Sequence, residues 1–503
     1  MADNNEYLIQ PGKLNINELK NVYHNKYSIY RIAPDAKMNM NASVNNIKLL
    51  LQNNNMQSVY GVNTGFGKLA STQIDLENLT KLQHNLIQSH CTGVGELLDD
   101  SFVRLVTILK VGSLARGYSG IRFEVLESLL TLINNEYYPC VPGKGSVGAS
   151  GDLAPLAHLV APLIGVGKVR KNGKIITALQ ALEECRLEKI DMQPLEGLSL
   201  LNGTQVSTAL ALKGLFKIRA VFEASLKASA FSLIAVEGNT APFDSRIHNL
   251  RGHQGQIAVA EKMRHLLLEG IPKEFLNKSG RVQDPYSFRC LPQVLGACLD
   301  QMNFIENILE IEANAVTNNP ISLFETNEFI SGGNFHAEPV AFAADMLAII
   351  CTEISSLSER RTSILLDSNL SGLPPFLVNN SGLNSGFMIA QVTAAALVSE
   401  NKSKSFPCSV DSIPTSANQE DHVSMATHAA NRISELAENA AYVVAIELLS
   451  AVQACDLRKV NKFSGNLQNI YNQIRTKVAF YDQDRYLADD IEYVKQLIFE
   501  SKV

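Results

Sequence analysis

The sequence predicts a mostly α-helical protein built around a bundle of long helices. This prediction rests on three long stretches that contain no helix-breaking residue. Residues 215–237, 340–371 and 421–464 contain no glycine and no proline. They are rich in Ala, Leu, Ile, Glu and Ser, and each is far longer than a typical strand. Long helices of this kind carry more apolar surface than one chain easily covers, so we expect an oligomer as well as a bundle.

The first helix with a clear start lies in the N-terminal part of the chain. Asp100 and Ser101 form an N-cap signal, and Gly117 provides a stop. Between them, apolar residues recur at helical spacing, namely Phe102, Leu105, Val106 and Leu109. The pattern predicts an amphipathic helix whose apolar face packs in the core.

Glycine and proline mark the predicted loops between helices. Segments rich in these residues lie near 61–67, 141–155, 280–296, 331–339 and 372–386. The first half of the chain holds most of the glycine-rich loops. We therefore expect a glycine-rich N-terminal region, 1–200, and a central long-helix bundle with C-terminal helices, 201–503. No linker marks this boundary, so one continuous domain is the alternative.

Composition and charge argue against several classes of partner. The 503 residues carry a net charge of −6 without a long basic block, so neither nucleic acid nor a membrane surface is an expected partner. The N-terminal residues lack the pattern of a secretory signal, and no apolar run looks long enough to span a bilayer. The eight scattered cysteines form no Cys-x-x-Cys pair, which favours reduced thiols and a cytoplasmic location. No set of residues has convincing metal-ligand spacing, so no metal is expected.

The segment 141–155, VPGKGSVGASGDLAP, is the most unusual in the chain. Gly143, Gly145 and Gly148 satisfy G-x-G-x-x-G, but nearby prolines disfavour the strand and helix that a dinucleotide site needs. No Gly-Lys-Ser/Thr closes a phosphate-binding loop, and the fifth position of a serine-hydrolase elbow is not glycine. A tight surface turn is the structural alternative.

A chemical interpretation of this segment is internal cyclisation. If the backbone folds sharply, the Gly151 nitrogen can attack the Ala149 carbonyl, because glycine is the least hindered residue for that attack. Loss of two waters would leave a dehydroalanine at Ser150 within a five-membered ring, 4-methylidene-imidazole-5-one (MIO). Spacing alone does not establish this reaction.

Residues 145–158, GSVGASGDLAPLAH, resemble the signature of the MIO-dependent aromatic amino acid ammonia-lyase and aminomutase family. The resemblance extends from about residue 55 to about residue 460. It implies the ammonia-lyase (fumarase/aspartase-like) architecture, with the MIO in the glycine-rich N-terminal region. It also implies autocatalytic formation of MIO by a crosslink between Ala149 and Gly151, without pyridoxal phosphate or another dissociable cofactor. A homotetramer with each active site built from three chains is a further implication.

Such a group suits the chemistry of ammonia elimination. The β-proton of an amino acid is barely acidic and neutral amine leaves poorly, so an electrophile must activate the substrate. MIO would take up the substrate amine at its alkene carbon. The motif YGVNTGFG, residues 60–67, is similar to a second family motif and implies that Tyr60 is the base. Its pKa must be depressed for that role near neutrality.

Three further motifs imply residues around the substrate. Asn202, in LNGTQ, is implied beside the ring and the amine. Gln283, Tyr286 and Arg289, in VQDPYSFRC, are implied to line the pocket. The Arg289 guanidinium suits the substrate carboxylate, because its planar fork binds both oxygens. Phe335, in GGNFHAEP, is implied to lie against the ring system, and an ordinary core aromatic is an equally good interpretation.

Two motifs speak to the substrate. The segment ending in His90, QHNLIQSH, resembles the histidine-specific branch, and so does SANQEDHVSM with Glu420. A buried carboxylate would be costly opposite a phenyl ring but suits an imidazole. The alternative for Glu420 is a charge at a helix N-terminus. The implied reaction is non-oxidative deamination of L-histidine to trans-urocanate and ammonia, the first step of histidine catabolism.

Several alternatives stay open. A tyrosine or phenylalanine ammonia-lyase and a MIO-dependent aminomutase are the nearest, and a non-catalytic helical scaffold is the alternative from another class. Two positions depart from the family pattern, Leu195 where Lys is common and Asn318 where Asp is usual, and we expect them to tune packing or local charge. Histidines within the matching motifs are expected to be structural or supporting: His158, His336 and His422.

Overall fold

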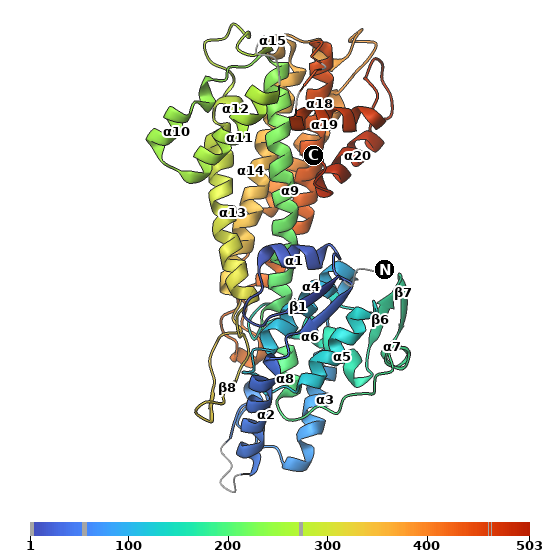
Figure 1. Cartoon of the computed structure of the whole chain (residues 1–503), viewed down its shortest axis with the longest axis vertical. Coiled ribbons are helices and arrows are strands. Elements are labelled where there is room, and N and C mark those ends of the chain that lie inside the picture. Colours follow the sequence, from blue (N-terminus) through green and yellow to red (C-terminus); the bar gives the residue numbers. More distant parts are fainter. Residues whose placement is uncertain (1–4, 53–57, 271–274, 461, 464) are drawn as a thin grey trace. The chain divides into compact units, whose positions relative to one another are not determined.

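The computed structural model describes residues 5–52, 58–270, 275–460, 462–463 and 465–503 (Figure 1). The chain divides into two compact units. The first unit comprises Met1–Lys213, Glu306–Asp345 and Pro407–Asn431, and the second comprises Gly214–Ile305, Met346–Phe406 and Arg432–Val503. The boundary near residue 200 stays a prediction.

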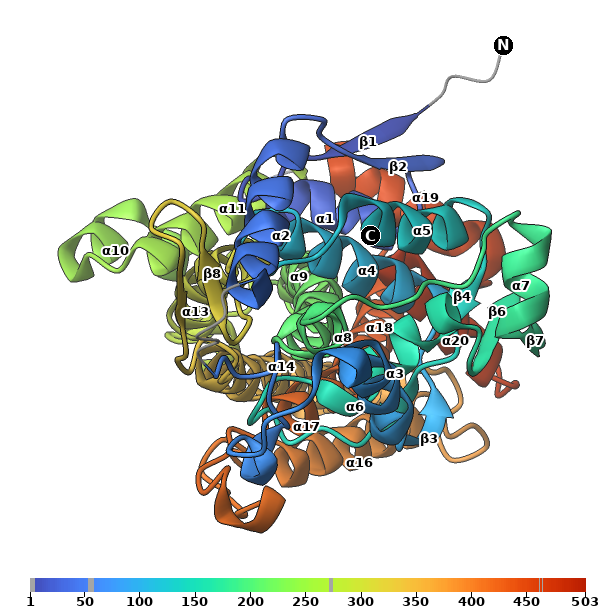
Figure 2. The same cartoon turned by 90° about the horizontal axis from the view of Figure 1, so that it is seen from below.

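Long helices supply the core of the second unit (Figure 2). They are α9 (Gln205–Ala235), α13 (Leu291–Ala313), α14 (Glu338–Leu366) and α18 (Ile433–Leu457). The breaker-free stretches predict three of these four. The exception is α13, which begins inside the segment 280–296 that its glycine and proline content predicts to be a loop. The longest predicted stretch is interrupted, because α17 (Ala426–Asn431) ends just before α18 begins. No glycine or proline in the sequence predicts that break. Helix α17 belongs to the first unit and α18 to the second.

A fully buried ion pair holds three of these helices together within the second unit. Arg361 on α14 donates from Nε and Nη2 to the two carboxylate oxygens of Glu447 on α18, at 2.6 and 2.7 Å. Ser232 on α9 donates to the same carboxylate at 2.8 Å, and neither charged side chain is exposed. Removing one partner of such a pair costs about 3–5 kcal/mol, because the other charge stays buried without a counterion.

Shorter elements complete the second unit. Helix α18 packs against α16 (Met388–Lys404) and α20 (Ala488–Phe499). The remaining elements are η4 (Ala241–Phe243), α10 (Ser245–Arg251), α11 (Gln254–Gly270), α12 (Tyr286–Arg289), α15 (Ser368–Ser371), η6 (Pro375–Leu377) and α19 (Gly465–Lys477).

The first unit combines shorter helices with small sheets. Its helices are α1 (Ile16–Tyr23), α2 (Ala36–Gln52), η1 (Gly67–Leu69), η2 (Leu76–Asn78), α3 (Leu79–His90), α4 (Asp100–Leu114), α5 (Phe123–Asn134), α6 (Leu153–Val160), η3 (Ala161–Ile164), α7 (Ala178–Glu184), α8 (Glu196–Leu201) and η7 (Ser416–Asn418), with α17 and the adjoining ends of α9, α13 and α14.

The strands of the first unit pair in small groups. Strands β1 (Glu6–Ile9) and β2 (Ile29–Ile32) are parallel, with Glu6 opposite Ile29. The antiparallel groups are β3 (Val94–Leu97) with β5 (Pro142–Lys144), then β4 (Tyr138–Pro139), β6 (Lys168–Lys171) and β7 (Lys174–Thr177) in that order, and β8 (Ile321–Leu323) with β9 (Glu328–Ile330). Strand β5 lies within the glycine-rich segment 141–155, and its pairing with β3 positions the start of that segment.

Helix α4 is the central helix of the first unit. It begins at Asp100 with Asp99 as the cap, whose side chain accepts a hydrogen bond from the Phe102 N–H. The predicted start is therefore correct within one residue. The helix is buried on nearly every face, including the lysine at position 110. The apolar face of α4 packs in the core as predicted, and other elements cover its remaining faces as well.

Two helical stretches are long and apolar enough to cross a membrane by length and composition, whereas the sequence pattern predicts no membrane-spanning run. They are Glu338–Leu366 and Ala426–Leu457, and 67% and 83% of their most apolar windows is buried within the protein. This burial is typical of core helices.

Candidate active site

A cavity of about 890 Å³ lies within the first unit. Segments far apart in the sequence contribute to its wall, including α3, the glycine-rich segment, the end of α8 and the loops before α14 and α17. Among its lining residues are these residues singled out from the sequence: Tyr60, His90, Ser150, Asn202, Phe335 and Glu420. Their roles stay predictions, but the fold brings them to one place.

The tripeptide 149–151 is held in a sharply folded backbone. Gly151 has a φ of +80°, and a Cβ there would overlap the backbone of Gly203. The N–H of Asp152 donates to the Gly203 carbonyl at 2.8 Å. Ala149 is buried. The segment is therefore a buried, constrained bend, and the interpretation as a surface turn is wrong.

Asp152 anchors this bend through hydrogen bonds to its carboxylate. Its buried carboxylate accepts hydrogen bonds from Ser146 Oγ at 2.9 Å, from Ser207 N at 2.7 Å and from Thr427 Oγ1 at 2.5 Å. A carboxylate with several donors is a rigid anchor, because its lone pairs are satisfied in fixed directions. Asp152 lies in the quoted motif, yet the sequence alone did not suggest this role.

Ser150 is bonded on both sides. Its Oγ donates to Glu420 Oε1 at 2.9 Å, and its carbonyl accepts a hydrogen bond from Asn202 Nδ2 at 2.7 Å. The other oxygens of these two partners, Glu420 Oε2 and Asn202 Oδ1, are buried and have no hydrogen-bond partner among the described residues. Burying an acceptor without a donor costs free energy, so a bound molecule that donates N–H groups to these two oxygens would remove that cost.

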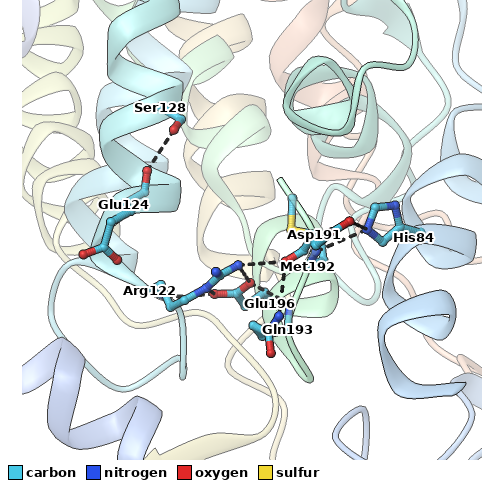
Figure 3. Close-up of polar contacts among 8 residues, drawn as sticks. All are labelled: His84, Arg122, Glu124, Ser128, Asp191, Met192, Gln193 and Glu196. Atoms are coloured by element: carbon cyan, nitrogen blue, oxygen red, sulfur yellow. Dashed lines mark hydrogen bonds and ion pairs between the residues drawn. The ribbon is translucent and has the colours of Figure 1, made fainter. Parts of the chain in front are cut away.

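Asn202 owes its position to the short helix α8. At the start of α8, the buried Glu196 carboxylate accepts from Arg122 Nε and Nη2, both at 2.8 Å, and from Gln193 N at 2.8 Å (Figure 3). At its end, Lys110 Nζ donates to the Asn202 carbonyl at 2.5 Å. Lys110 is fully buried, and burial lowers its pKa to about 7. A lone lysine in the apolar run of α4 is the sequence signal that could have pointed to it.

The two departures from the family pattern have structural roles near α8. Leu195 is buried and has a φ of +76°, directly before the first residue of α8. Asn318 accepts from Ser119 Oγ at 3.1 Å and donates from Nδ2 to the Ser199 carbonyl at 3.0 Å. An ionised aspartate could not make that second bond, because it has no proton to donate. Asparagine therefore suits this position.

Tyr60 reaches the cavity beside Phe66, whose ring it meets edge to face at 6.2 Å between centroids. Its hydroxyl oxygen accepts a hydrogen bond from Gly67 N at 3.1 Å. Burial raises the pKa of Tyr60, the Glu420 charge raises it further, and the Gly67 N–H opposes both effects. The role of a base near neutrality calls for a depressed pKa, so the single chain shifts the group in the opposite direction.

His90 ends α3 at the cavity wall. Ser89 Oγ donates to the Leu86 carbonyl at 3.1 Å and lies 3.1 Å from His90 Nδ1. A hydroxyl proton directed to the Leu86 carbonyl favours the tautomer in which Nδ1 carries the ring proton and Nε2 is an acceptor. Burial lowers the pKa of His90, which keeps the ring neutral at physiological pH.

The other predicted pocket residues do not line this cavity. Gln283, Tyr286 and Arg289 belong to the second unit. Gln283 and Tyr286 are exposed, and Arg289 stacks on the Tyr286 ring at 5.1 Å and donates from Nε to the Asp284 carbonyl at 3.0 Å. Among the described residues, the cavity lining includes Lys68 but not Arg289, the cation predicted for a substrate carboxylate.

Comparison with known proteins defines the class. Residues 14–476 match the model of the aromatic amino acid lyase family. The chain belongs to this family, and its fold, the bend at 149–151 and the cavity agree with that membership.

Individual relatives are more specific. The chain is 51% identical over 492 residues to histidine ammonia-lyase from Idiomarina loihiensis, covering 97% of this chain and 96% of the relative. The crystal structure of histidine ammonia-lyase from Trypanosoma cruzi superposes with a TM-score of 0.90 at 37% identity, over 98% of this chain and 94% of that one. Tyrosine aminomutase from Streptomyces globisporus gives a TM-score of 0.92 at 32% identity, over 99% and 97%.

Proposed function

We propose that this chain is a histidine ammonia-lyase, which converts L-histidine to trans-urocanate and ammonia. The similarity to histidine ammonia-lyases over nearly the whole chain supports this activity. The observation that carries it is the buried, unpartnered Glu420 Oε2, in the same cavity wall as the neutral His90. A substrate imidazole offers an N–H donor to Glu420 Oε2, and in its protonated form a second N–H to His90 Nε2, whereas a phenyl ring would leave the carboxylate oxygen without a partner.

The residues of the bend fit a MIO formed from Ala149, Ser150 and Gly151. Gly151 occupies a backbone position where a side chain would collide with Gly203, and the Gly151 nitrogen must be unhindered for the ring to close. Asn202 Nδ2 already donates to the Ser150 carbonyl, the oxygen that would take up charge as the ring accepts electrons. When formed, MIO supplies the electrophile that makes ammonia a better leaving group.

The chain's own residues then have separate tasks. Tyr60 removes the β-proton, His90 Nε2 and Glu420 Oε2 hold the imidazole, and Asn202 Oδ1 accepts from the substrate amine. Phe335 contributes an apolar surface to the same wall. With these groups in place, the substrate is oriented before its proton is taken.

In a homotetramer with shared sites, another chain supplies the Arg289 cation that the lining of this cavity lacks. In this proposal Gln283, Tyr286 and Arg289 of one chain complete the cavity of another, with Arg289 on the substrate carboxylate. Exposed apolar residues support assembly, because they repeat at seven-residue spacing on α13 (Phe304 and Ile311) and α14 (Phe342 and Ile349). We also propose a cytoplasmic enzyme of histidine catabolism.

Complementation between chains tests this arrangement. Tyr60→Phe and Arg289→Ala are each expected to be inactive alone, because each lacks one essential group. Co-expressed as mixed oligomers, they should recover part of the activity, since some sites then combine Tyr60 from an Arg289→Ala chain with Arg289 from a Tyr60→Phe chain. Absence of recovery in mixed oligomers verified by mass would argue against sharing of the site.

Assaying L-histidine, L-tyrosine and L-phenylalanine side by side tests the activity itself. Urocanate from L-histidine, without a β-amino product, is the expected result. The tyrosine aminomutase similarity makes a β-amino acid the informative alternative outcome. No turnover of any of the three, together with an intact mass that shows no loss of water, would leave a non-catalytic helical protein.

A further inference from the structure

A cluster of metal-ligating side chains lies on two segments that also line the cavity. His336 and Glu338 flank the start of α14, and His422 lies in the loop before α17. One ligand atom from each lies within 4.8 Å of the other two. The sequence showed no metal spacing here, because more than 80 residues separate the second and third members.

We propose that His336, Glu338 and His422 form a binding site for one divalent transition-metal ion of the Zn²⁺ type. Two imidazoles and a carboxylate are a ligand set that Zn²⁺ accepts, with water in the remaining position. Mg²⁺ and Ca²⁺ are excluded as preferred occupants because they favour sites built from oxygen ligands.

The local geometry needs only small adjustments to bind the ion. His336 Nε2 and Glu338 Oε2 are already 3.0 Å apart, and the two imidazole rings are nearly parallel, 19° between planes and 5.8 Å between centroids. Ligand atoms around tetrahedral zinc are roughly 3 to 4 Å apart. The ligand atoms of all three residues lie within 4.8 Å of one another, so the exposed His422 side chain must move closer to the other two for the ion to bind.

The ring of His422 has a partner that can orient it. Ser412 Oγ lies 3.5 Å from His422 Nδ1 and accepts a hydrogen bond from Val423 N at 3.1 Å. A hydroxyl oxygen has two lone pairs, so it can also accept from Nδ1–H. In that tautomer Nε2 is free for the metal, the arrangement commonly found around metal-bound histidine.

The position of the site gives it a mechanical role. Both ligand-bearing segments are tied to the Gly148 carbonyl, by Ala337 N at 3.4 Å and by Ser424 Oγ at 3.0 Å. Each segment also carries a cavity residue, Phe335 next to one ligand and Glu420 two residues from another. A bound ion would crosslink these segments and fix two residues of the cavity wall.

Metal titration of the untagged full-length protein, stripped with a chelator, tests the proposal. Co²⁺ should bind at one ion per chain with a visible ligand-field spectrum, and Zn²⁺ should displace it and raise the melting temperature. His422→Ala and Glu338→Gln should each lose the spectrum and the thermal shift. His428→Ala, which removes an exposed histidine of α17, is the matched control and should keep both.

Two results would overturn the proposal. One is wild-type protein that binds no more Co²⁺ than His422→Ala, which would mean that the cluster is only an ion pair beside a stacked ring. The other is unchanged stoichiometry in both ligand variants, which would place the metal on thiols or elsewhere. Neither result bears on histidine turnover, because the readouts are binding and stability.

Discussion

Ser150 Oγ donates a hydrogen bond to Glu420 Oε1 across 2.9 Å, although 270 residues separate the two positions in the chain. The contact joins the residue expected to become the electrophile to the residue expected to read the substrate ring. The second oxygen of Glu420 is left buried without a partner among the described residues. Predictions about both residues therefore depend on one small region of the cavity.

Ser150→Ala should keep the mass of the uncyclised chain, whereas the wild-type protein should be lighter by two waters. Without the serine oxygen no dehydroalanine can form, so ammonia release from L-histidine should fall to background. Intact-mass spectrometry and a urocanate assay measure the two effects. Ser128→Ala on α5, outside the cavity lining, is the control and should show the normal loss of water.

Tyr60→Phe should lower kcat by at least ~100-fold, the contribution typical of a positioned general base. The fold should persist, because the variant loses only the hydroxyl that accepts from Gly67 N. Circular dichroism and steady-state kinetics provide the measurements. Tyr486→Phe, at a residue 75% exposed, is the matched control. Near-normal kcat in Tyr60→Phe would remove Tyr60 as the base.

The activity should rise with pH on the alkaline side of neutrality. Tyr60 must be deprotonated to act as the base, and its pKa is raised, first by burial and then by Glu420. A raised pKa means that the fraction of active base increases as pH climbs toward that value. A profile of kcat/KM for L-histidine tests this, and a profile that falls steadily above pH 7 would contradict it.

Glu420→Gln should reduce kcat/KM for L-histidine by at least ~100-fold, because the amide removes the negative charge and one of the two acceptor oxygens. The residual activity should reach its alkaline plateau at lower pH, since the charge that raises the Tyr60 pKa is gone. Glu124→Gln, at an exposed position of α5, should change neither property. Unaltered histidine turnover in Glu420→Gln would exclude the carboxylate from substrate recognition.

Lys110 should make the stability of the protein depend on pH. Its pKa is about 7 in the folded chain because burial disfavours the charge, and the nearby Asp152 opposes this effect. In the unfolded chain the pKa returns to the ordinary value of about 10.4, so the unfolded state binds more protons between the two values. The contribution of Lys110 to stability therefore rises as pH increases from 7 toward 10.

Comparing wild type with Lys110→Met isolates this effect, because other ionisations are shared. Between pH 7 and pH 9, the free energy of unfolding of the wild type should gain about 2 kcal/mol relative to the variant. Urea unfolding at both pH values measures it. Equal pH dependence in the two proteins would show that Lys110 keeps an ordinary pKa in the folded state.

The fold class and much of the site could be predicted from the linear sequence. Long stretches without glycine or proline favour helix whatever surrounds them, so α9, α14 and α18 follow from local propensity. The tripeptide 149–151 can also be recognised from local sequence, because the expected ring closure involves three consecutive residues. Motif resemblance named residues that line one cavity, and also Gln283, Tyr286 and Arg289, which do not line it.

Only the tertiary structure decided which groups face one another and in which direction the pKa of each is shifted. Burial of Lys110 and the raised pKa of Tyr60 arise from neighbours that no local pattern reveals. The approach of His336 and His422 is likewise a product of packing. The physical reason is that helix propensity acts over a few residues, whereas desolvation and Coulomb interactions act through space between segments that are distant in the sequence.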